Sequence, residues 1–351
     1  MIFKERTIVK CIIITLLTLM LLIASATAGT ATQSAQNTVI GAGDGTVITE
    51  SITLTASADG QVTQDAQNNA IVIGDDVTVD QSVVVEGQGS TVDQNMNAGS
   101  ANNVVGAGDD ALVDQSLSMT AIATDGNANQ LAIQNAAYAG DDAAVTQTTT
   151  IAAAANSGAV NQFAGNAAFF TGDSATINQN ITGTAVARDD IVQVFGNLGM
   201  GFGNGARYTQ VVKGGANSTD AGVFQFGGNF AGVPGAAFTG MRSNQSVLFS
   251  AAADNQVVQM GGNAAFAHNG ATLGQEIGMS ADAEDIAQFA GNFATAGNNF
   301  AANQAIALTV ESDEGNVAQI GGNLFVDRNL AGGSNSRLGQ MISARSTGAD
   351  N

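Results

Sequence analysis

The stretch 160–190, VNQFAGNAAFFTGDSATINQNITGTAVARDD, decides the fold of this chain. Two runs of alternating side chains are separated by the Gly-Asp pair at 172–173, and a pair of Asp residues closes the stretch. In the first run Gln162 precedes Asn166 by four residues, and in the second run Gln179 is followed by apolar or small residues at every second position. A period of two is typical of β-strands with one buried face. The stretch therefore predicts strand, turn, strand, turn.

The same unit recurs ten times. Successive equivalents of Asn166 are 29 to 34 residues apart, and they are Asn37, Asn68, Asn102, Gln134, Asn166, Asn197, Asn229, Asn263, Asn292 and Asn323. Four residues earlier lie Gln33, Gln64, Gln130, Gln162, Gln193, Gln225, Gln259, Gln288 and Gln319, with Ala98 expected to break this column in the third unit. A second column of the unit consists of Glu50, Gln81, Gln115, Gln147, Gln179, Gln210, Gln245, Gln275, Gln304 and Gln340. Repetition at such a period indicates a stacked array.

We therefore expect an all-β protein, a two-sheet β-solenoid of about ten coils with about 32 residues per coil. Equivalent strands of successive units would pair in parallel and form two facing sheets. The register should be strongly fixed, because a slip of one residue would expose every core side chain. The ten repeats are expected to form a single domain over residues 29–351.

The inward Gln and Asn columns need hydrogen-bond partners, since an unpaired buried amide costs a few kcal/mol. Stacked identical amides meet this need, because each side-chain oxygen can accept a bond from the amide one coil away. We expect these amide ladders to hold the coils in register and to have no catalytic role.

Residues 1–28 have the features of a secretory signal peptide. A basic start with Lys4, Arg6 and Lys10 precedes the apolar stretch 12–23, and residues 26–28 are Ala-Thr-Ala, a small-x-small cleavage site. An uncleaved anchor is the alternative. We expect a secreted, extracellular protein at the cell surface, without stable membrane insertion after cleavage. Cys11 is the only cysteine and would leave with the signal, so no disulfide stabilises the mature chain.

The composition excludes several functions. Loss of the signal changes the net charge from −20 to −22, which argues against nucleic acid as a partner because phosphates would be repelled. His268 is the only histidine, and the mature chain has no cysteine. A zinc site therefore lacks ligands, and there are not several histidines around which a Ser-His-Asp set could be sought. We expect a protein that is not an enzyme and that has no organic cofactor.

The later units resemble the curlin repeat, in which Gln, Gly, Asn-x-Ala and a second Gln occur within a strand-loop-strand unit. The segments 225–231 (QFGGNFA), 259–265 (QMGGNAA) and 319–323 (QIGGN) carry this likeness. The unit here is longer than a curlin unit, and its second Gln follows the first after 16 to 21 residues. The resemblance, shared with β-solenoid surface-fibre and sheath subunits, implies a solenoid architecture and a tendency to self-assemble.

One outward column changes along the chain. From the fifth unit on, the residue after the first Gln is apolar: Phe163, Val194, Phe226, Met260, Phe289 and Ile320. Strands that are apolar on both faces are normally covered on both. We expect these residues to form a lateral interface with another copy or another protein. The alternative is that this column turns inward and the amides face outward.

The Gly-Asp turns form a column of carboxylates consisting of Asp44, Asp75, Asp109, Asp141 and Asp173. Stacked about 5 Å apart, these charges repel one another, and calcium could bridge them. Solvated turn residues, present for turn geometry, are the alternative.

These features predict a secreted structural protein that polymerises with itself by coil stacking and lateral packing into an extracellular fibre, sheath or biofilm matrix. Other cell-surface or matrix components are further expected partners. The alternative is a cell-surface adhesin or ligand-binding solenoid that binds glycan or ice through the Thr/Ser face of the second strand, for example around Thr53 and Thr148.

Overall fold

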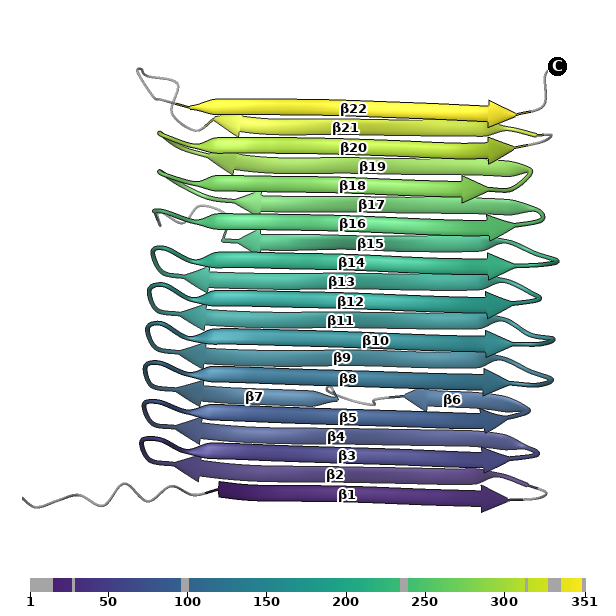
Figure 1. The fold of residues 1–351 in the computed structure, drawn as a ribbon, viewed down its shortest axis with the longest axis horizontal. Coiled ribbons are helices and arrows are strands. Elements are labelled where there is room, and N and C mark those ends of the chain that lie inside the picture. Colours follow the sequence, from purple (N-terminus) through teal and green to yellow (C-terminus); the bar gives the residue numbers. More distant parts are fainter. Residues whose placement is uncertain are drawn as a thin grey trace, which may run out of the picture.

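The computed structural model describes residues 15–26, 29–95, 101–233, 239–312, 315–327 and 336–348. Every regular element in these residues is a β-strand (Figure 1). The strands form two parallel sheets, which we call sheet A and sheet B. Within this described part of the chain there is no helix long and apolar enough to cross a membrane.

Sheet A holds the first strand of the chain and the second strand of every repeat. In sheet order its strands are β1 (Thr15–Ala26), β3 (Val47–Ala58), β5 (Thr78–Gly89), β8 (Leu112–Ala123), β10 (Ala144–Ala155), β12 (Thr176–Ala187), β14 (Arg207–Ser218), β16 (Arg242–Ala253), β18 (Thr272–Asp282), β20 (Ala301–Ser312) and β22 (Arg337–Gly348). Each strand pairs only with strands one coil away.

Sheet B holds the first strand of every repeat. Its strands are β2 (Ala31–Ala42), β4 (Gln61–Ile73), β6 (Thr91–Asn95), β7 (Asn102–Ala107), β9 (Ala128–Ala139), β11 (Val160–Thr171), β13 (Ile191–Phe202), β15 (Val223–Gly232), β17 (Gln256–Phe266), β19 (Asp285–Ala296) and β21 (Val317–Asp327). In the third coil β6 and β7 lie end to end in one row, and both pair with β4 and β9.

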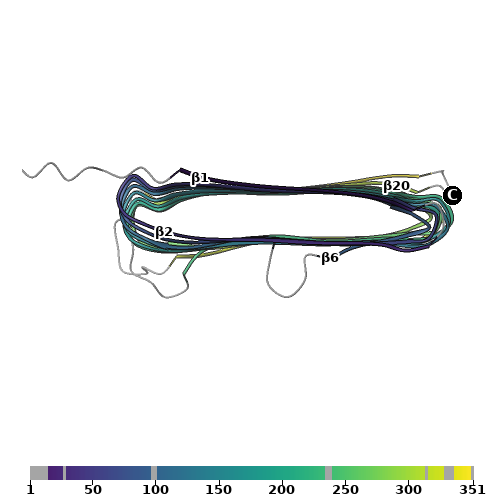
Figure 2. The ribbon, with the colours of Figure 1, turned by 90° about the horizontal axis from the view of Figure 1, so that it is seen from below.

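The two sheets face each other as a flattened ring in cross-section (Figure 2). Pairing is in register, so that Gln162 of β11 lies beside Gln130 of β9 and Gln193 of β13. The predicted fold, a two-sheet β-solenoid with about 32 residues per coil and inward Gln/Asn ladders, is confirmed. It follows from the period of two in each strand, because only this register buries every second side chain.

Glycine at the Gly-Asp turns is required by the backbone. Gly108 has a φ of 137°, and a Cβ built on it would lie 2.0 Å from the carbonyl oxygen of Gly74 in the coil before. The turn stacks backbone directly on backbone, which leaves no room for a side chain. The same contact recurs at Gly74, Gly140 and Gly172.

Strand β1 lies inside the segment predicted to be a secretory signal. It pairs in parallel with β3, with Thr18 opposite Glu50. Residues 1–14 and 27–28 of the predicted signal lie outside the described residues. In this chain the first coil is therefore flanked in sheet A by a strand that belongs to no repeat.

Candidate assembly surfaces

The second amide column forms a continuous ladder in sheet A. In each coil the Gln Nε2 donates a hydrogen bond to the side-chain oxygen of the equivalent residue in the preceding coil, over 2.6 to 3.0 Å. The ladder starts with Gln81 donating to Glu50 and ends with Gln340 donating to Gln304. Nε2 also donates across the core to a sheet B carbonyl, for example from Gln81 to Asn103 at 3.2 Å. The ladder thus has one polarity and ties the two sheets together.

The first Gln column forms the same kind of ladder in sheet B, with one correction. In the third coil its member is Gln94, which donates to Gln64 at 3.0 Å and accepts from Gln130 at 2.9 Å. The predicted break at Ala98 is therefore wrong, and Ala98 itself lies outside the described residues. The third coil contains extra residues between β6 and β7, so its Gln lies eight residues before Asn102 instead of four. All the predicted members, from Gln33 to Gln319, lie in this ladder.

The Asn column forms a third ladder of opposite polarity. Asn37 Nδ2 donates to Asn68 Oδ1 at 3.0 Å, and this direction, toward the following coil, is kept up to Asn323. The exception is the fourth coil, where Gln134 reaches Asn166 through the hydroxyl of Thr149. The three ladders are buried up to the ninth coil, and in the tenth Gln319 and Asn323 are half-buried and Gln340 is exposed, which confirms the predicted inward orientation of the amides within the stack.

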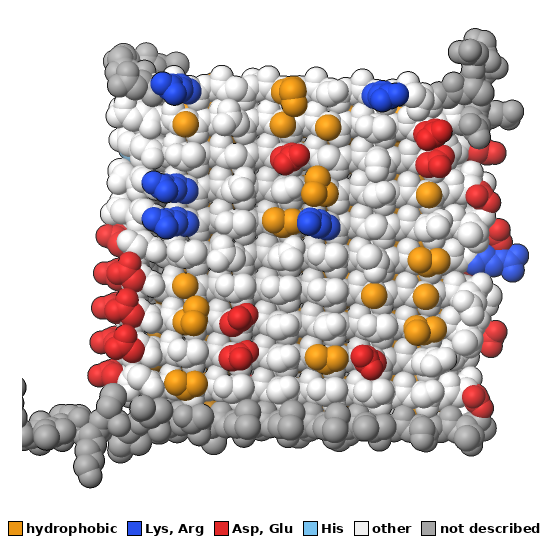
Figure 3. Space-filling view, viewed as in Figure 1, with side chains coloured by type: hydrophobic (Ala, Val, Ile, Leu, Met, Phe, Trp, Pro, Cys, Tyr) orange, Lys and Arg blue, Asp and Glu red, His pale blue; other side chains and the backbone are white. Residues whose placement is uncertain are grey.

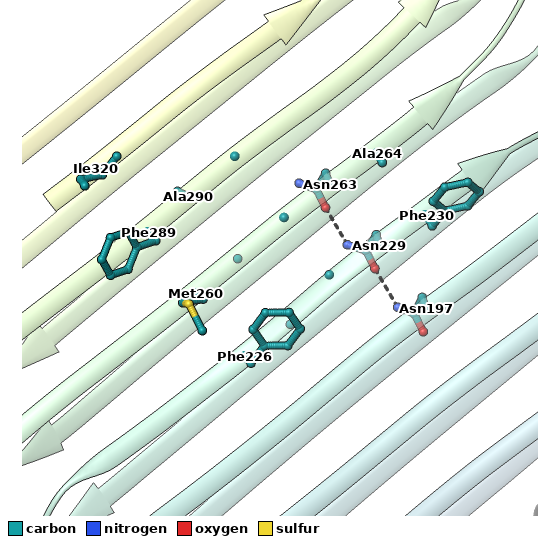
Figure 4. Close-up of a pocket in the computed structure, with 15 residues that line it drawn as sticks. Asn197, Phe226, Asn229, Phe230, Met260, Asn263, Ala264, Phe289, Ala290 and Ile320 are labelled. Carbon is teal, nitrogen blue, oxygen red and sulfur yellow. Dashed lines mark hydrogen bonds between the residues drawn. The ribbon is translucent and has the colours of Figure 1, made fainter. Parts of the chain in front are cut away.

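The outer face of sheet B carries an apolar groove over coils five to ten. One wall is the predicted lateral column, Phe163, Val194, Phe226, Met260, Phe289 and Ile320, and the other is Ala167, Leu198, Phe230, Ala264, Phe293 and Leu324. The first wall points outward, with Phe226 45% and Ile320 60% exposed. Around coils seven to nine the groove encloses about 500 Å³ (Figure 4). The Phe column thus points outward, and lateral packing through it stays a prediction.

Glycines form the floor of the apolar groove. They lie in register as Gly165, Gly196, Gly228, Gly262, Gly291 and Gly322. A Cβ at Gly165, Gly196 or Gly291 would have its nearest neighbour 3.9 to 4.0 Å away, and at Gly322 it would have none within 4 Å. None of the six has a positive φ. At Gly228 a Cβ would lie 2.9 Å from the carbonyl oxygen of Gly262, so the fold restricts this one position, and it does not require glycine at the other five. Glycine weakens a strand unless something approaches the backbone closely.

The Asp column lies along one edge of the first half of the stack, where Figure 3 shows acidic side chains gathered. Each of the first four carboxylates accepts a hydrogen bond from the backbone N–H of the next Asp in the column, and Asp173 accepts one from the backbone N–H of Asn204. The donors are Asp75 to Asp44 at 3.2 Å, Asp109 to Asp75 and Asp141 to Asp109 at 2.9 Å, and Asp173 to Asp141 at 2.7 Å. Among the described residues no group of three or more His, Cys, Asp or Glu side chains is placed to hold a metal ion. The geometry gives these carboxylates a structural role, and bridging by calcium stays a prediction.

The two ends of the stack differ in sheet A. At the C-terminal end β21 and β22 are the last strands of their sheets, and Leu338 and Ile342 of β22 are about half exposed, at 48% and 50%. At the N-terminal end β3 is flanked by β1, and Glu50 has no exposed surface. Burial raises the pKa of Glu50 to about 6, and the hydrogen bond from Gln81 opposes this rise. One of its oxygens, Oε1, is buried without a hydrogen-bond partner.

The outer face of sheet A is mostly polar and flat, with scattered charged and apolar side chains (Figure 3). Outward positions carry small hydroxyl residues, such as Thr53 and Thr55 of β3 and Thr148 and Thr150 of β10. The register breaks these columns, since Thr53 lies beside Val84 and Thr182 beside Lys213. This surface offers hydrogen-bonding groups without a regular two-dimensional lattice.

Sequence reasoning missed the groove floor and the partnerless oxygen of Glu50. The signal for the floor was present, because each glycine lies three residues after the first Gln of its unit. A signal for the unusual environment of Glu50 was also present, since Glu50 is the only acidic residue in a column of glutamines. No family model, curated protein or solved structure matches this chain.

Proposed function

We propose that this chain is a secreted structural protein that self-assembles into an extracellular fibre, sheath or biofilm matrix. The observation that carries the proposal is the match between the two ends of the stack. The first coil begins with Gln33 and Asn37 on β2, and the last coil ends with Gln319 and Asn323 on β21, in the same register positions. The coils of one copy can therefore continue into the coils of the next.

Open strand edges support assembly by coil stacking. Unpaired N–H and C=O groups at the end of a β-solenoid are a template for another chain, and solenoids that stay monomeric cover their ends with polar caps. The described residues after β21 contain only β22, which extends sheet A and itself ends with half-exposed apolar side chains. Leu338 and Ile342 of β22 thus offer apolar surface on which a further coil could pack.

The apolar groove supports lateral packing of the stacks. A continuous exposed apolar surface marks an interaction site or an aggregation hazard in a soluble protein. The groove runs along the axis of the stack, so that a stack of joined copies would carry it as a repeating surface. A second copy, or another cell-surface or matrix component, is the partner that this surface fits.

The experiment is negative-stain electron microscopy of the chain secreted with its own first 28 residues. We expect filaments whose length grows with protein concentration and whose diffraction has a repeat of about 4.8 Å along the axis. A discrete monomer at high concentration, without filaments at any pH between 4 and 8, would refute the proposal.

A second candidate function is a surface adhesin that binds glycan through the outer face of sheet A. The observation that favours it is the set of outward Thr and Ser side chains on that face, for example in β3 and β10. A glycan array and an ice-recrystallisation assay with monomeric protein separate the two candidates. Binding by monomers that form no filaments would support the adhesin.

A further inference from the structure

Glu50 is the one acidic member of the sheet A ladder, and one of its two carboxylate oxygens lacks a hydrogen-bond partner. Its Oε2 accepts the hydrogen bond from Gln81 Nε2 at 2.6 Å. Its Oε1 is buried and has no partner, although β1 lies alongside β3 at this point. In every later coil the equivalent residue is a Gln that donates to the coil before it. At the position of Glu50 the pattern of the ladder requires a hydrogen-bond donor toward the preceding coil. An ionised carboxylate can only accept hydrogen bonds, so it cannot fill this role.

A second copy can supply the strand that belongs beside β3. The chain alternates between sheets, so after β21 and β22 the next coil of a continuing stack would be β2 and β3. The strand beside β3 would then be β22 of the preceding copy, in the place that β1 holds here. Continuation of the register places Gln340 beside Glu50, because Gln340 pairs with Gln304 and Glu50 with Gln81.

Building on the secretion and self-assembly proposed above, we propose that the side of β3 that β1 occupies here docks β22 of a second copy, head to tail, once residues 1–28 are cleaved. In this junction the Glu50 carboxyl, in its protonated form, donates a hydrogen bond to Gln340 Oε1. The polarity of the ladder sets this arrangement. Gln340 Nε2 is engaged by Gln304, so Oε1 is the atom left for the next coil. An ionised Glu50 would place two acceptors face to face at the junction.

The other two ladders need no such adjustment. Gln33 would donate to Gln319 of the preceding copy, as every later Gln in that column donates to the coil before it. Asn323 would donate to Asn37 of the following copy, in the direction of the Asn ladder. The junction is thus complementary at two ladders and depends on a proton at the third. If the side-chain oxygen and nitrogen of every Gln in the sheet A ladder are exchanged, Gln340 can donate to Glu50. Gln81 then turns its oxygen toward Glu50, so two acceptors still face each other when Glu50 is ionised.

Joining of copies should therefore take up a proton. In the covered state burial raises the pKa of Glu50 from 4.5 to about 6. A raised carboxyl pKa favours the joined state below pH 4.5, and this advantage is lost as the pH rises through about 6. The corresponding change in the joining constant is roughly 30-fold.

No other charge faces this carboxyl from the described strands packed against β3. Strands β1 and β2 contain no charged residue. The charged residues of β4 and β5 occupy positions that alternate with the inward ones and face outward, and they are Asp65, Asp80 and Glu86. On the docking side, Arg337 and Arg345 of β22 alternate in the same way with Gln340, and β21 has only Asp327 at its far end.

The docking register is tested by a disulfide between copies. Continuation of the stack places Ser51 beside Met341 on the outer face, whereas within one chain nine coil steps of about 4.8 Å hold them roughly 43 Å apart. The chain carrying both Ser51→Cys and Met341→Cys, secreted with its own leader and checked by mass spectrometry for loss of Cys11, should give a ladder of oligomers on a non-reducing gel. The control, Ser51→Cys with Arg345→Cys, is displaced by about 13 Å and should stay monomeric under the same oxidation. Equal cross-linking by both pairs would overturn the proposed register.

The role of Glu50 is tested by the pH dependence of filament elongation in seeded light-scattering assays. For the wild type we expect a critical concentration roughly 15-fold lower at pH 4.5 than at pH 7.5, about half of the limiting 30-fold because free Glu50 is half protonated at pH 4.5. Glu50→Gln restores the residue found in the other coils and should make the critical concentration low at both values. The matched control Glu86→Gln, on the outer face, should keep the wild-type pH dependence. Filaments with the same pH dependence in wild type and Glu50→Gln would overturn this inference and leave the proposed function standing, whereas absence of filaments from every variant at every pH would overturn both.

Discussion

Gln134 Nε2 donates a hydrogen bond to Thr149 Oγ1 at 2.7 Å, and the same hydroxyl donates to Asn166 Oδ1 at 2.8 Å. The two residues are the exceptions in their columns. Gln134 replaces an Asn, and Thr149 replaces an Ile, Val or Leu. They face each other across the core, so the hydroxyl closes the one gap in the Asn ladder. Two departures from the repeat, on different strands, thus compensate each other.

This compensation predicts strong coupling between the two positions. Thr149→Val removes the hydroxyl and leaves Gln134 and Asn166 short of a partner, which should lower the free energy of unfolding by about 1–3 kcal/mol. Gln134→Asn combined with Thr149→Ile restores the residues of the other coils and should recover the loss. A double-mutant cycle from denaturant unfolding measures the coupling, with wild type, Gln134→Asn, Thr149→Ile and the double variant as its four corners. Additive effects would contradict the proposed relay.

A second coupling predicts which glycines the fold itself requires. A Cβ on Gly183 would lie 2.1 Å from Phe195 Cζ, whereas one on Gly165 would meet nothing closer than 3.9 Å. We expect Gly183→Ala to destabilise the protein by about 1–3 kcal/mol through overpacking. Gly165→Ala should stabilise it by about 0.5–1 kcal/mol, because alanine loses less backbone entropy. Thermal unfolding of both variants, and recovery of Gly183→Ala by Phe195→Leu, checks the assignment.

The same pair of glycines shows how far the sequence determines this fold. Strand positions, register and the inward amides follow from the period of two and the recurrence of the unit, so Gln162 and Asn166 could be placed from the sequence. The period of two places Gly183 on the inward face and Gly165 on the outward face, but it does not show how much room a side chain would have at either. The lack of room at Gly183 depends on Phe195 of the opposite sheet, and the repeat alone does not predict contacts between the sheets.

The third coil shows a second limit. A fixed spacing of four residues between Gln and Asn led to Ala98, although Gln94 occupies the ladder. Hydrogen bonding to both neighbouring coils selects the residue, and an insertion between strands changes the spacing without changing the ladder.

The environment of Glu50 could also be predicted only in part. Glu50 could be seen as an exception in its column, but the lack of a partner for Oε1 depends on the polarity of nine successive hydrogen bonds.

Filling the floor of the apolar groove should separate lateral packing from coil stacking. We expect the triple variant Gly196→Val, Gly262→Val, Gly291→Val to form filaments that no longer bundle, because three side chains occupy the floor that a partner would approach. The wild-type backbone angles and the open space above the floor allow these side chains. The control is the triple variant Thr55→Val, Thr150→Val, Thr182→Val, which places three Val side chains on the outer face of sheet A. Electron microscopy of filament widths decides, and bundles of normal width in the groove variant would exclude the groove as the lateral contact.

Neutralising the Asp column should stabilise the first half of the stack. In Asp75→Asn, Asp109→Asn, Asp141→Asn each side chain keeps an oxygen to accept the backbone N–H, while like charges about 5 Å apart are removed. We expect a higher Tm than wild type at low ionic strength and an equal Tm in about 1 M NaCl, where the Debye length is about 3 Å. Scanning calorimetry in NaCl and in CaCl2 at equal ionic strength tests the calcium prediction. A rise in the wild-type Tm specific to calcium, lost in the Asn variant, would show bridging.

Retention of the leader should block the head of the stack. Strand β1 occupies the side of β3 on which β22 of another copy would dock, and it does so in full register from Thr15 to Ala26. Because a β-strand edge can be paired only once, a chain that keeps residues 1–28 should not accept a preceding copy. We expect the full chain, produced without export, to remain monomeric at a concentration at which the exported product forms filaments.

The matched control tests β1 itself by breaking its pairing with β3. The variant carrying both Thr18→Pro and Met20→Pro in the unexported chain loses two backbone N–H groups at the centre of β1 that point toward β3, which weakens the pairing of the two strands. If β1 acts as a cap, this variant should regain elongation, and at pH 4.5 more readily than at pH 7.5, because Glu50 then meets Gln340 of the preceding copy. Seeded growth measured on both chains distinguishes capping from misfolding, since a misfolded chain would not elongate existing filaments at either pH. Equal growth of the unexported and exported wild-type chains would show that β1 does not cover the junction.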